Sequence, residues 1–94
     1  MKVFITKTFK RSASKLHRNQ VIILEKNIEK ISASPDIGEA KVGDLAGVRV
    51  YKFHMLHQLI LLTYIYNELQ KEITLLDFAS HENFYKNLKK QLKN

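Results

Sequence analysis

The stretch that decides the fold is Val48–Tyr66, which reads VRVYKFHMLHQLILLTYIY. It is rich in β-branched and aromatic residues, has neither Gly nor Pro, and divides at positions 56–58 into two runs of strand length. Side chains alternate between the faces of a strand, so the first run is predicted to have two different faces. One face carries Val48, Val50, Lys52 and His54, and the other carries Arg49, Tyr51, Phe53 and Met55. The second run, Leu59–Tyr66, is apolar at nearly every position, which predicts a central strand covered on both faces.

The composition is that of one small basic domain, residues 1–94. An apolar fraction of 45% is typical of a chain with a hydrophobic core. Sixteen Lys and Arg residues against nine Asp and Glu residues give a formal charge of +7. Such a charge attracts nucleic acid, an anionic membrane or an acidic protein. The alternative is a lysine-rich surface that serves only solubility.

The chain has no cysteine, which excludes disulfides, thiolate zinc sites and a thiol nucleophile. No apolar run reaches the roughly 18–20 residues of a membrane span. The apolar start of the chain meets Lys7 too early to form the apolar region of a signal peptide. We therefore expect a cytoplasmic protein with no membrane partner.

The N-terminal part of the chain predicts a short strand followed by two helices. Val3–Ile5 is expected to form the strand, and Thr8 the N-cap of a first helix that ends near Leu16. A second, longer helix has Asn19 as its expected N-cap and apolar residues at helical spacing. It is expected to stop at Ser34, because the residue before a proline disfavours the α conformation.

The remainder predicts a loop at 36–47, a third strand of the central sheet at 73–79 and a last helix at 81–92. The loop holds all three glycines, and Ser80 is the expected N-cap of the last helix. The predicted order is β-α-α-β-β-β-α. This order is typical of an α+β fold with a mostly antiparallel sheet, an N-terminal helical hairpin and a C-terminal helix.

Lys52 and His54 form the first candidate site. They project from one face of a strand beside the core, where such a pair could grip a phosphate and move a proton near neutral pH. A solvated strand face is the simpler alternative. No Asp or Glu stands close to His54 and His57 in sequence, so neither a metal site nor another cofactor is predicted.

The second candidate site lies at 80–86, where the last helix begins. A helix start offers free amides to an anion, His81 could act as an acid or base, and Tyr85 could stack on a nucleobase. The alternative is a capped helix whose aromatic side chains pack on the sheet. The two candidate sites could share one cleft, because the last helix follows the last strand.

Three segments carry a family resemblance: IGEAK at 37–41, GDLAGVRVYKF at 43–53 and HENFYKNLK at 81–89. With the order of elements, they resemble the RelE/ParE superfamily, the toxins of bacterial type II toxin–antitoxin systems. The resemblance covers nearly the whole chain. It implies a compact sheet with a helical hairpin, and a cognate antitoxin protein that keeps the toxin inactive.

RelE-like members of this superfamily are ribosome-dependent ribonucleases, in which a ribose 2′-OH of the mRNA attacks the adjacent phosphate. The resemblance places Lys52 and His54 at basic positions of the strand that serves catalysis. It places His81 near a C-terminal basic position and Tyr85 at a C-terminal tyrosine. The implied catalytic residues are Lys52, His54, His81 and Tyr85, with mRNA on the ribosome as the partner.

One departure from the RelE pattern leaves a second activity open. RelE-like toxins usually carry an arginine on the next strand, whereas this chain has Leu59–Leu62 there. The cations that could replace it in binding nucleic acid are Lys41, Arg49 and Lys86. ParE-like toxins inhibit DNA gyrase and do not cut RNA, so they would tolerate the loss. The expected function is an mRNA endonuclease toxin, and the alternative is a gyrase inhibitor.

Overall fold

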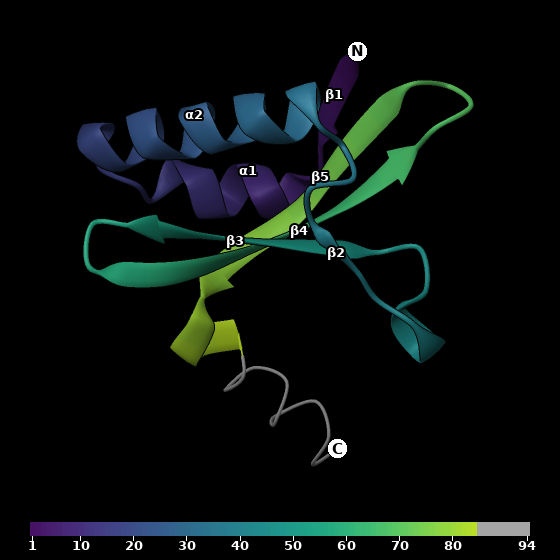
Figure 1. Ribbon diagram of the computed structural model, residues 1–94. Helices are drawn as coiled ribbons and strands as arrows, with labels where there is room; N and C mark the ends of the chain where they lie inside the picture. The colour runs from purple at the N-terminus through teal and green to yellow at the C-terminus, as the bar shows by residue number, and fades with distance from the viewer. Residues whose placement is uncertain (85–94) are drawn as a thin grey trace.

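The computed structural model describes residues 1–84, which form a five-stranded sheet with two helices packed on one side (Figure 1). The elements, in chain order, are β1 (Lys2–Ile5), α1 (Lys7–Ser14), α2 (Arg18–Ala33), β2 (Glu39–Ala40), the 3-10 turn η1 (Gly43–Leu45), β3 (Arg49–Met55), β4 (Gln58–Asn67) and β5 (Glu72–Ser80). The strand order is β1-β5-β4-β3-β2, in which β1 runs parallel to β5 and every other neighbouring pair is antiparallel. The predicted α+β fold is confirmed.

The strand β4 is central, as its apolar sequence predicts. It pairs with β3 on one side and β5 on the other. Leu61 and Leu62 point to opposite faces of the sheet, and both are buried. Ile60, Leu61 and Leu62 are buried in succession, so β4 buries side chains on both of its faces, which explains the continuous apolar run.

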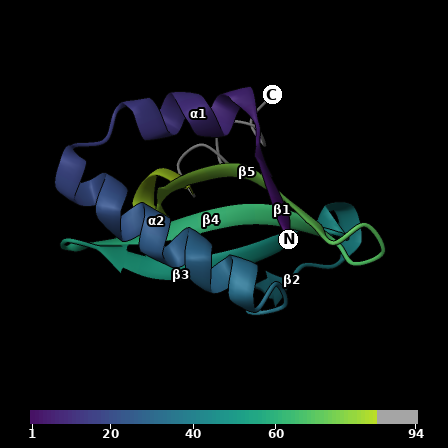
Figure 2. The ribbon, with the colours of Figure 1, turned by 90° about the horizontal axis from the view of Figure 1, so that it is seen from above.

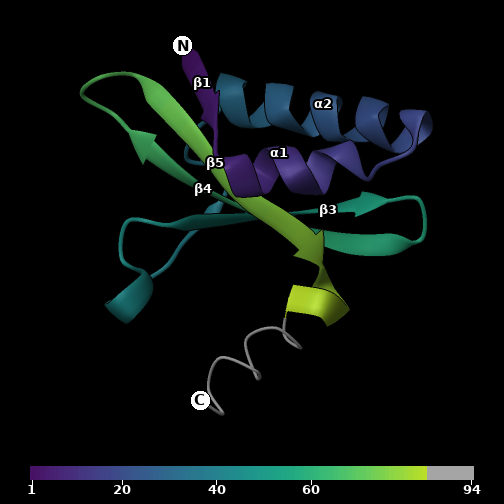
Figure 3. The same cartoon turned by 180° about the vertical axis from the view of Figure 1, so that it is seen from behind.

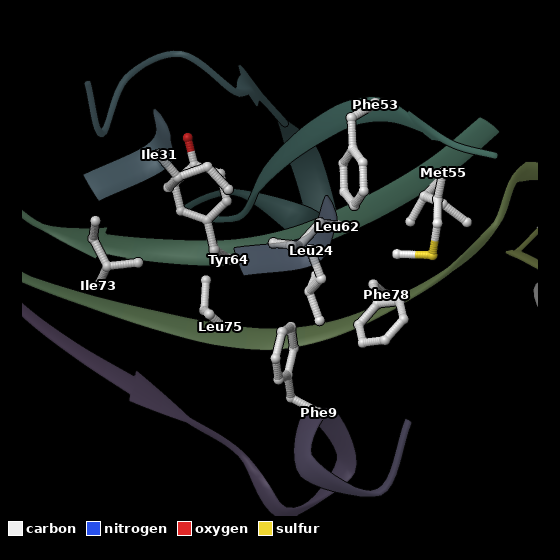
Figure 4. Packing of buried hydrophobic residues seen from close by; sticks show 11 residues of the cluster. Phe9, Leu24, Ile31, Phe53, Met55, Leu62, Tyr64, Ile73, Leu75 and Phe78 are labelled. Atoms are coloured by element: carbon white, nitrogen blue, oxygen red, sulfur yellow. The ribbon is translucent and has the colours of Figure 1, made fainter. Parts of the chain in front are cut away.

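The alternation predicted for β3 is also correct. Phe53 and Met55 are buried against the helices, whereas Lys52 and His54, which alternate with them, are exposed. The helix-covered face holds the main core (Figure 4). The buried core residues are Phe9, Leu24, Ile31, Phe53, Met55, Ile60, Leu62, Tyr64, Ile73, Leu75 and Phe78.

Both helices lie over the same face of the sheet (Figure 2). The ring of Phe9 from α1 meets the ring of Phe78 from β5 edge to face, with centroids 5.1 Å apart. The Ser12 hydroxyl donates a 2.7 Å hydrogen bond to the carboxylate of Asp77 beside it. These contacts turn the apolar side of α1 towards the core and leave its opposite side in solvent.

Two predicted helix caps are wrong by two residues. The first helix begins at Lys7, because Thr6 has an extended backbone and its hydroxyl accepts a hydrogen bond from the Phe9 amide at 3.0 Å. Thr8 therefore lies inside the helix. The second helix begins at Arg18, with His17 as its N-cap in place of Asn19.

The other differences lie in the connections. The expected loop at 36–47 contains the two-residue strand β2 and the turn η1, both too short to show a sequence period. Ser80 caps the last helix as predicted, since its hydroxyl accepts a hydrogen bond from the Asn83 amide at 3.2 Å. Residues 81–84 form its first turn, and the remainder of the expected helix lies outside the described residues.

Candidate functional site

The sheet face turned away from the helices carries the first candidate residues. Lys52 and His54 are exposed there, two positions apart on β3. Lys52 pairs with Leu61 on β4, and Leu61 in turn pairs with Ala79 on β5. Lys52 and His54 therefore project from one face, as predicted. On that face the neighbouring strand β4 is apolar, and the small side chain of Ala79 follows on β5.

His81 lies at the same end of the sheet as His54. His54 pairs with Leu59 near the start of β4, and the next β4 residue, Ile60, pairs with Ser80 at the end of β5. His81 follows Ser80 directly and is exposed. Neighbouring strands lie about 4.8 Å apart, so the backbones of β3 and β5 are separated by roughly 10 Å at this end. We call Lys52, His54 and His81 the strand-end site.

The turn that carries His81 lies on the side of the sheet away from α1 and α2 (Figure 3). This is the same side to which Lys52 and His54 point. The register thus brings three of the four predicted catalytic residues to one end and one side of the sheet. The fourth, Tyr85, lies outside the described residues, as does Lys86.

The floor of the strand-end site is apolar. Val50 and Leu61 are 6% and 3% exposed, and neither belongs to the core cluster under the helices. Both lie on the same face as Lys52, by the alternation of β3 and by strand pairing. An apolar floor lowers the local dielectric, so nearby charges interact more strongly with a phosphate than they would in open water.

Arg49 lies on the other face of β3 and has structural partners. Its Nη1 donates hydrogen bonds to the carbonyl oxygens of Asp36 at 3.2 Å and Gly38 at 2.7 Å. The structure therefore does not bring Arg49 to the strand-end site. Lys41 is also held locally, with its Nζ 3.4 Å from the carboxylate of Glu39. Their expected contacts with nucleic acid stay predictions.

Tyr64 also holds the loop after α2, through two hydrogen bonds that we call the clamp. Its hydroxyl donates to the Pro35 carbonyl at 2.7 Å and accepts from the Gly38 amide at 2.9 Å. A Cβ on residue 38 would lie 2.7 Å from the Tyr64 hydroxyl, so glycine is required there for close approach. Burial raises the pKa of the Tyr64 phenol, and the hydrogen bond from Gly38 opposes that rise. This role was not predicted from the sequence, in which a tyrosine within the apolar run of β4 is its only sign.

Within residues 1–84, no three His, Asp or Glu side chains converge as metal ligands would. None of the helices described is long and apolar enough to cross a membrane. The outward-facing residues of β4 are Leu59, Leu61, Thr63 and Ile65, and the whole strand contains no Lys, Arg or His. The arginine expected of a RelE-like toxin on this strand is thus absent from it.

The architecture is that of RelE-type toxins. The toxin–antitoxin complex RelBE2 from Mycobacterium tuberculosis contains a chain of similar fold, with a TM-score of 0.72 and 20% identity over 85% of this chain and 96% of that one. The isolated Escherichia coli toxin RelE gives a TM-score of 0.67 and 14% identity over 95% of this chain and 96% of that one. A chain of the RelE–RelB complex of Pyrococcus horikoshii gives a TM-score of 0.60 and 15% identity over 84% of this chain and 92% of that one. These identities establish the fold alone.

Family membership rests on the sequence itself. Residues 3–89 match the model of the ParE-like toxins of type II bacterial toxin–antitoxin systems. The chain belongs to that family and is a toxin of the RelE/ParE type. A comparison with curated protein sequences finds no match.

Proposed function

We propose that this toxin is a ribosome-dependent mRNA endonuclease that arrests translation and is neutralised by a cognate antitoxin. The observation that carries the proposal is the exposure of Lys52 and His54 side by side on the free face of β3, with His81 at the adjacent strand end. Within residues 1–84 Lys52 forms no salt bridge, and an exposed ammonium group above an apolar floor suits the binding of a phosphodiester.

The proposed reaction is an attack of a ribose 2′-oxygen on the adjacent phosphorus. His54 accepts the proton of the 2′-OH as the new P–O bond forms, because a histidine can take up a proton near neutral pH. The bond from phosphorus to the 5′-oxygen breaks, and His81 donates a proton to that leaving oxygen. Lys52 binds the non-bridging oxygens and stabilises their growing negative charge. The products are a 2′,3′-cyclic phosphate and a 5′-hydroxyl. Tyr85 is assigned to stacking on a base of the codon.

The partner proposals follow from the fold neighbours and the charge. The structures from Mycobacterium tuberculosis and Pyrococcus horikoshii are complexes of a toxin with its antitoxin. A net charge of +7 favours an acidic protein partner as well as RNA. We therefore propose an antitoxin that binds this chain in the cytoplasm, and mRNA on the ribosome as the target.

Mapping of mRNA ends after brief induction in a bacterium tests the endonuclease. We expect new 5′ ends inside translated codons, and we expect them to vanish when translation is blocked. Lys52→Ala and His54→Ala should abolish both the cuts and the growth arrest, whereas Lys26→Ala on the exposed side of α2 should keep them. Uncut mRNA in growth-arrested cells would overturn the proposal.

A second candidate is inhibition of DNA gyrase, and the absence of any cation from β4 favours it. A toxin that only binds a protein target needs no group to neutralise a phosphorane. Plasmid supercoiling in the same induced cultures separates the two candidates. Loss of negative supercoiling with intact mRNA would establish the gyrase inhibitor in place of the endonuclease.

A further inference from the structure

The positive charge of the chain is concentrated at its N-terminal end. Six of the 16 Lys and Arg residues lie within the first 24 positions, and none of the nine Asp and Glu residues does. The first acidic residue is Glu25. A lysine-rich composition alone adds cations throughout a chain, but it does not remove acids from one quarter of it. This segment therefore accounts for six of the seven net charges.

The structure gathers most of these cations on α1 and the residue that ends it. Lys7, Lys10, Arg11 and the C-cap residue Lys15 are all exposed, and we call these four residues the α1 basic face. Within residues 1–84, none of the four forms a salt bridge. The opposite side of the helix is already used by the core, through Phe9 and the Ser12–Asp77 hydrogen bond.

This arrangement is unfavourable for a helix by itself. Lys7 and Arg11 are four residues apart, as are Arg11 and Lys15, and like charges at that spacing repel across one turn. The first turn of α1 contains no acid, although the helix dipole favours one there. The neighbouring helix α2 also has no acid in its first turn, but Glu25 and Glu29 stand among its lysines. Local rules that are broken at one place, with no compensating contact, are typical of a binding surface.

We propose that the α1 basic face binds the phosphate backbone of a double-helical nucleic acid. From Lys7 to Lys15 the helix rises about 12 Å, a length over which a duplex presents several phosphates. The site does not depend on either activity proposed above. The helix α1 lies on the helix side of the sheet (Figure 1), whereas Lys52 and His54 alternate with the buried Phe53 and Met55 and therefore project from the opposite face. The chain can therefore hold a duplex with α1 while its free sheet face engages a different target.

The chemistry of the surface favours a nucleic-acid backbone over a membrane or the apolar centre of a protein interface. A membrane-binding helix inserts an apolar face into lipid, but the apolar face of α1 is buried against β5. A protein interface has an apolar centre ringed by polar groups, and the exposed positions of α1 contain no large apolar residue. Phosphate binding requires neither, because it rests on the release of counterions by cations alone.

Binding of the full-length chain to a fluorescent RNA duplex, measured over a range of salt concentrations, tests the proposal. The informative variant is Lys7→Gln with Arg11→Gln, since glutamine keeps helix propensity and removes the charge. The matched control is Lys26→Gln with Lys30→Gln, which removes two exposed charges at the same spacing from α2. The first variant should bind on the order of 50-fold more weakly near 0.1 M salt and lower the salt slope by about 2. The control should change the slope by less than half as much.

A second variant, Lys10→Gln with Lys15→Gln, should lose duplex affinity in the same way. Agreement between the two variants would show that the loss in the first does not come from unfolding. Neither pair should lower the melting temperature, because each removes repulsion within α1. Equal slope changes for the α1 and α2 pairs would overturn the proposal, since binding would then follow net charge alone. Tighter binding of the wild type to phosphatidylserine vesicles than to the duplex, lost in the α1 pairs, would overturn it in favour of a membrane surface.

Discussion

The two faces of β3 differ in what their side chains contact. Phe53 and Met55 point under the helices and are buried, whereas Lys52 and His54, which alternate with them, are exposed on the free face. The same backbone supports both faces, so a single strand serves stability on one side and, we propose, chemistry on the other. The comparison separates residues whose loss should unfold the protein from residues whose loss should leave it folded.

The helix-covered face has few polar groups, and these are paired. Tyr64 is fully buried and uses its hydroxyl to hold both Pro35 and Gly38. On the free face, by contrast, Lys52 and His54 form no hydrogen bond or salt bridge within the described part of the chain. Exposed side chains without such contacts add little to stability. Substitutions of Lys52 and His54 can therefore test the proposed function without unfolding the protein.

The largest expected effect is that of Phe53→Ala. The substitution removes a buried ring from the core and should lower the free energy of unfolding by about 3–5 kcal/mol, a large part of the stability of a small domain. Urea denaturation followed by circular dichroism measures the change. If Phe53→Ala lowered the free energy of unfolding no more than the substitution of an exposed residue does, the division of β3 into a stabilising face and a functional face would be contradicted.

Tyr64→Phe should have the next largest effect. It keeps the ring but leaves the buried Gly38 amide and Pro35 carbonyl without their partner, which costs roughly 1–3 kcal/mol. The control is Tyr66→Phe, because the Tyr66 hydroxyl makes no hydrogen bond within residues 1–84. Equal unfolding free energies for the two variants would show that the clamp contributes nothing.

The raised pKa of Tyr64 predicts a loss of stability in alkali. Burial favours the neutral phenol, so the folded state binds this proton more tightly than the unfolded state does. The stabilisation is complete below the ordinary tyrosine pKa of about 10 and is lost as pH rises through the raised value. Unfolding midpoints measured from neutral pH to about pH 11 should fall less steeply for Tyr64→Phe than for the wild type. If the unfolding midpoints of the two proteins fell in parallel with pH, Tyr64 would not be the cause of the alkaline loss of stability.

The smallest expected change in stability is that of Lys52→Ala. The side chain is exposed and unpaired within the described residues, so the unfolding free energy should stay within about 0.5 kcal/mol of the wild type. The same urea titration measures it beside Phe53→Ala. A loss above about 1.5 kcal/mol would assign Lys52 to the fold and weaken its functional role.

The sequence was most informative where a period could be counted. Alternation along β3 placed Lys52 and Phe53 on the correct faces, and the apolar run of β4 located the centre of the sheet. The prediction of Thr8 as the first N-cap is wrong, because Thr6 has the same chemistry two residues earlier and is the N-cap. Tertiary contact decides it, since the Thr6 hydroxyl also donates to the Leu76 carbonyl on β5.

The site was partly predictable for the same reason. Lys52 and His54 share a face by alternation, but their approach to His81 depends on the pairing of β4 with β5. Arg49 is one of the cations expected to replace, in binding nucleic acid, the arginine that is missing from β4. Its guanidinium instead donates hydrogen bonds to the carbonyl oxygens of Gly38 and Asp36, which lie 11 and 13 residues earlier in the chain. No local sequence pattern predicts this contact.

The most direct test of the functional division is single-turnover mRNA cleavage on purified ribosomes. Wild type, His54→Ala and Lys26→Ala would be compared on one programmed complex, with unfolding free energies measured on the same preparations. We expect cleavage by the wild type and by Lys26→Ala, and a rate on the order of 10²–10⁴ lower for His54→Ala with unchanged stability. Cleavage by His54→Ala at the wild-type rate would contradict the assignment of the free face of β3 to catalysis.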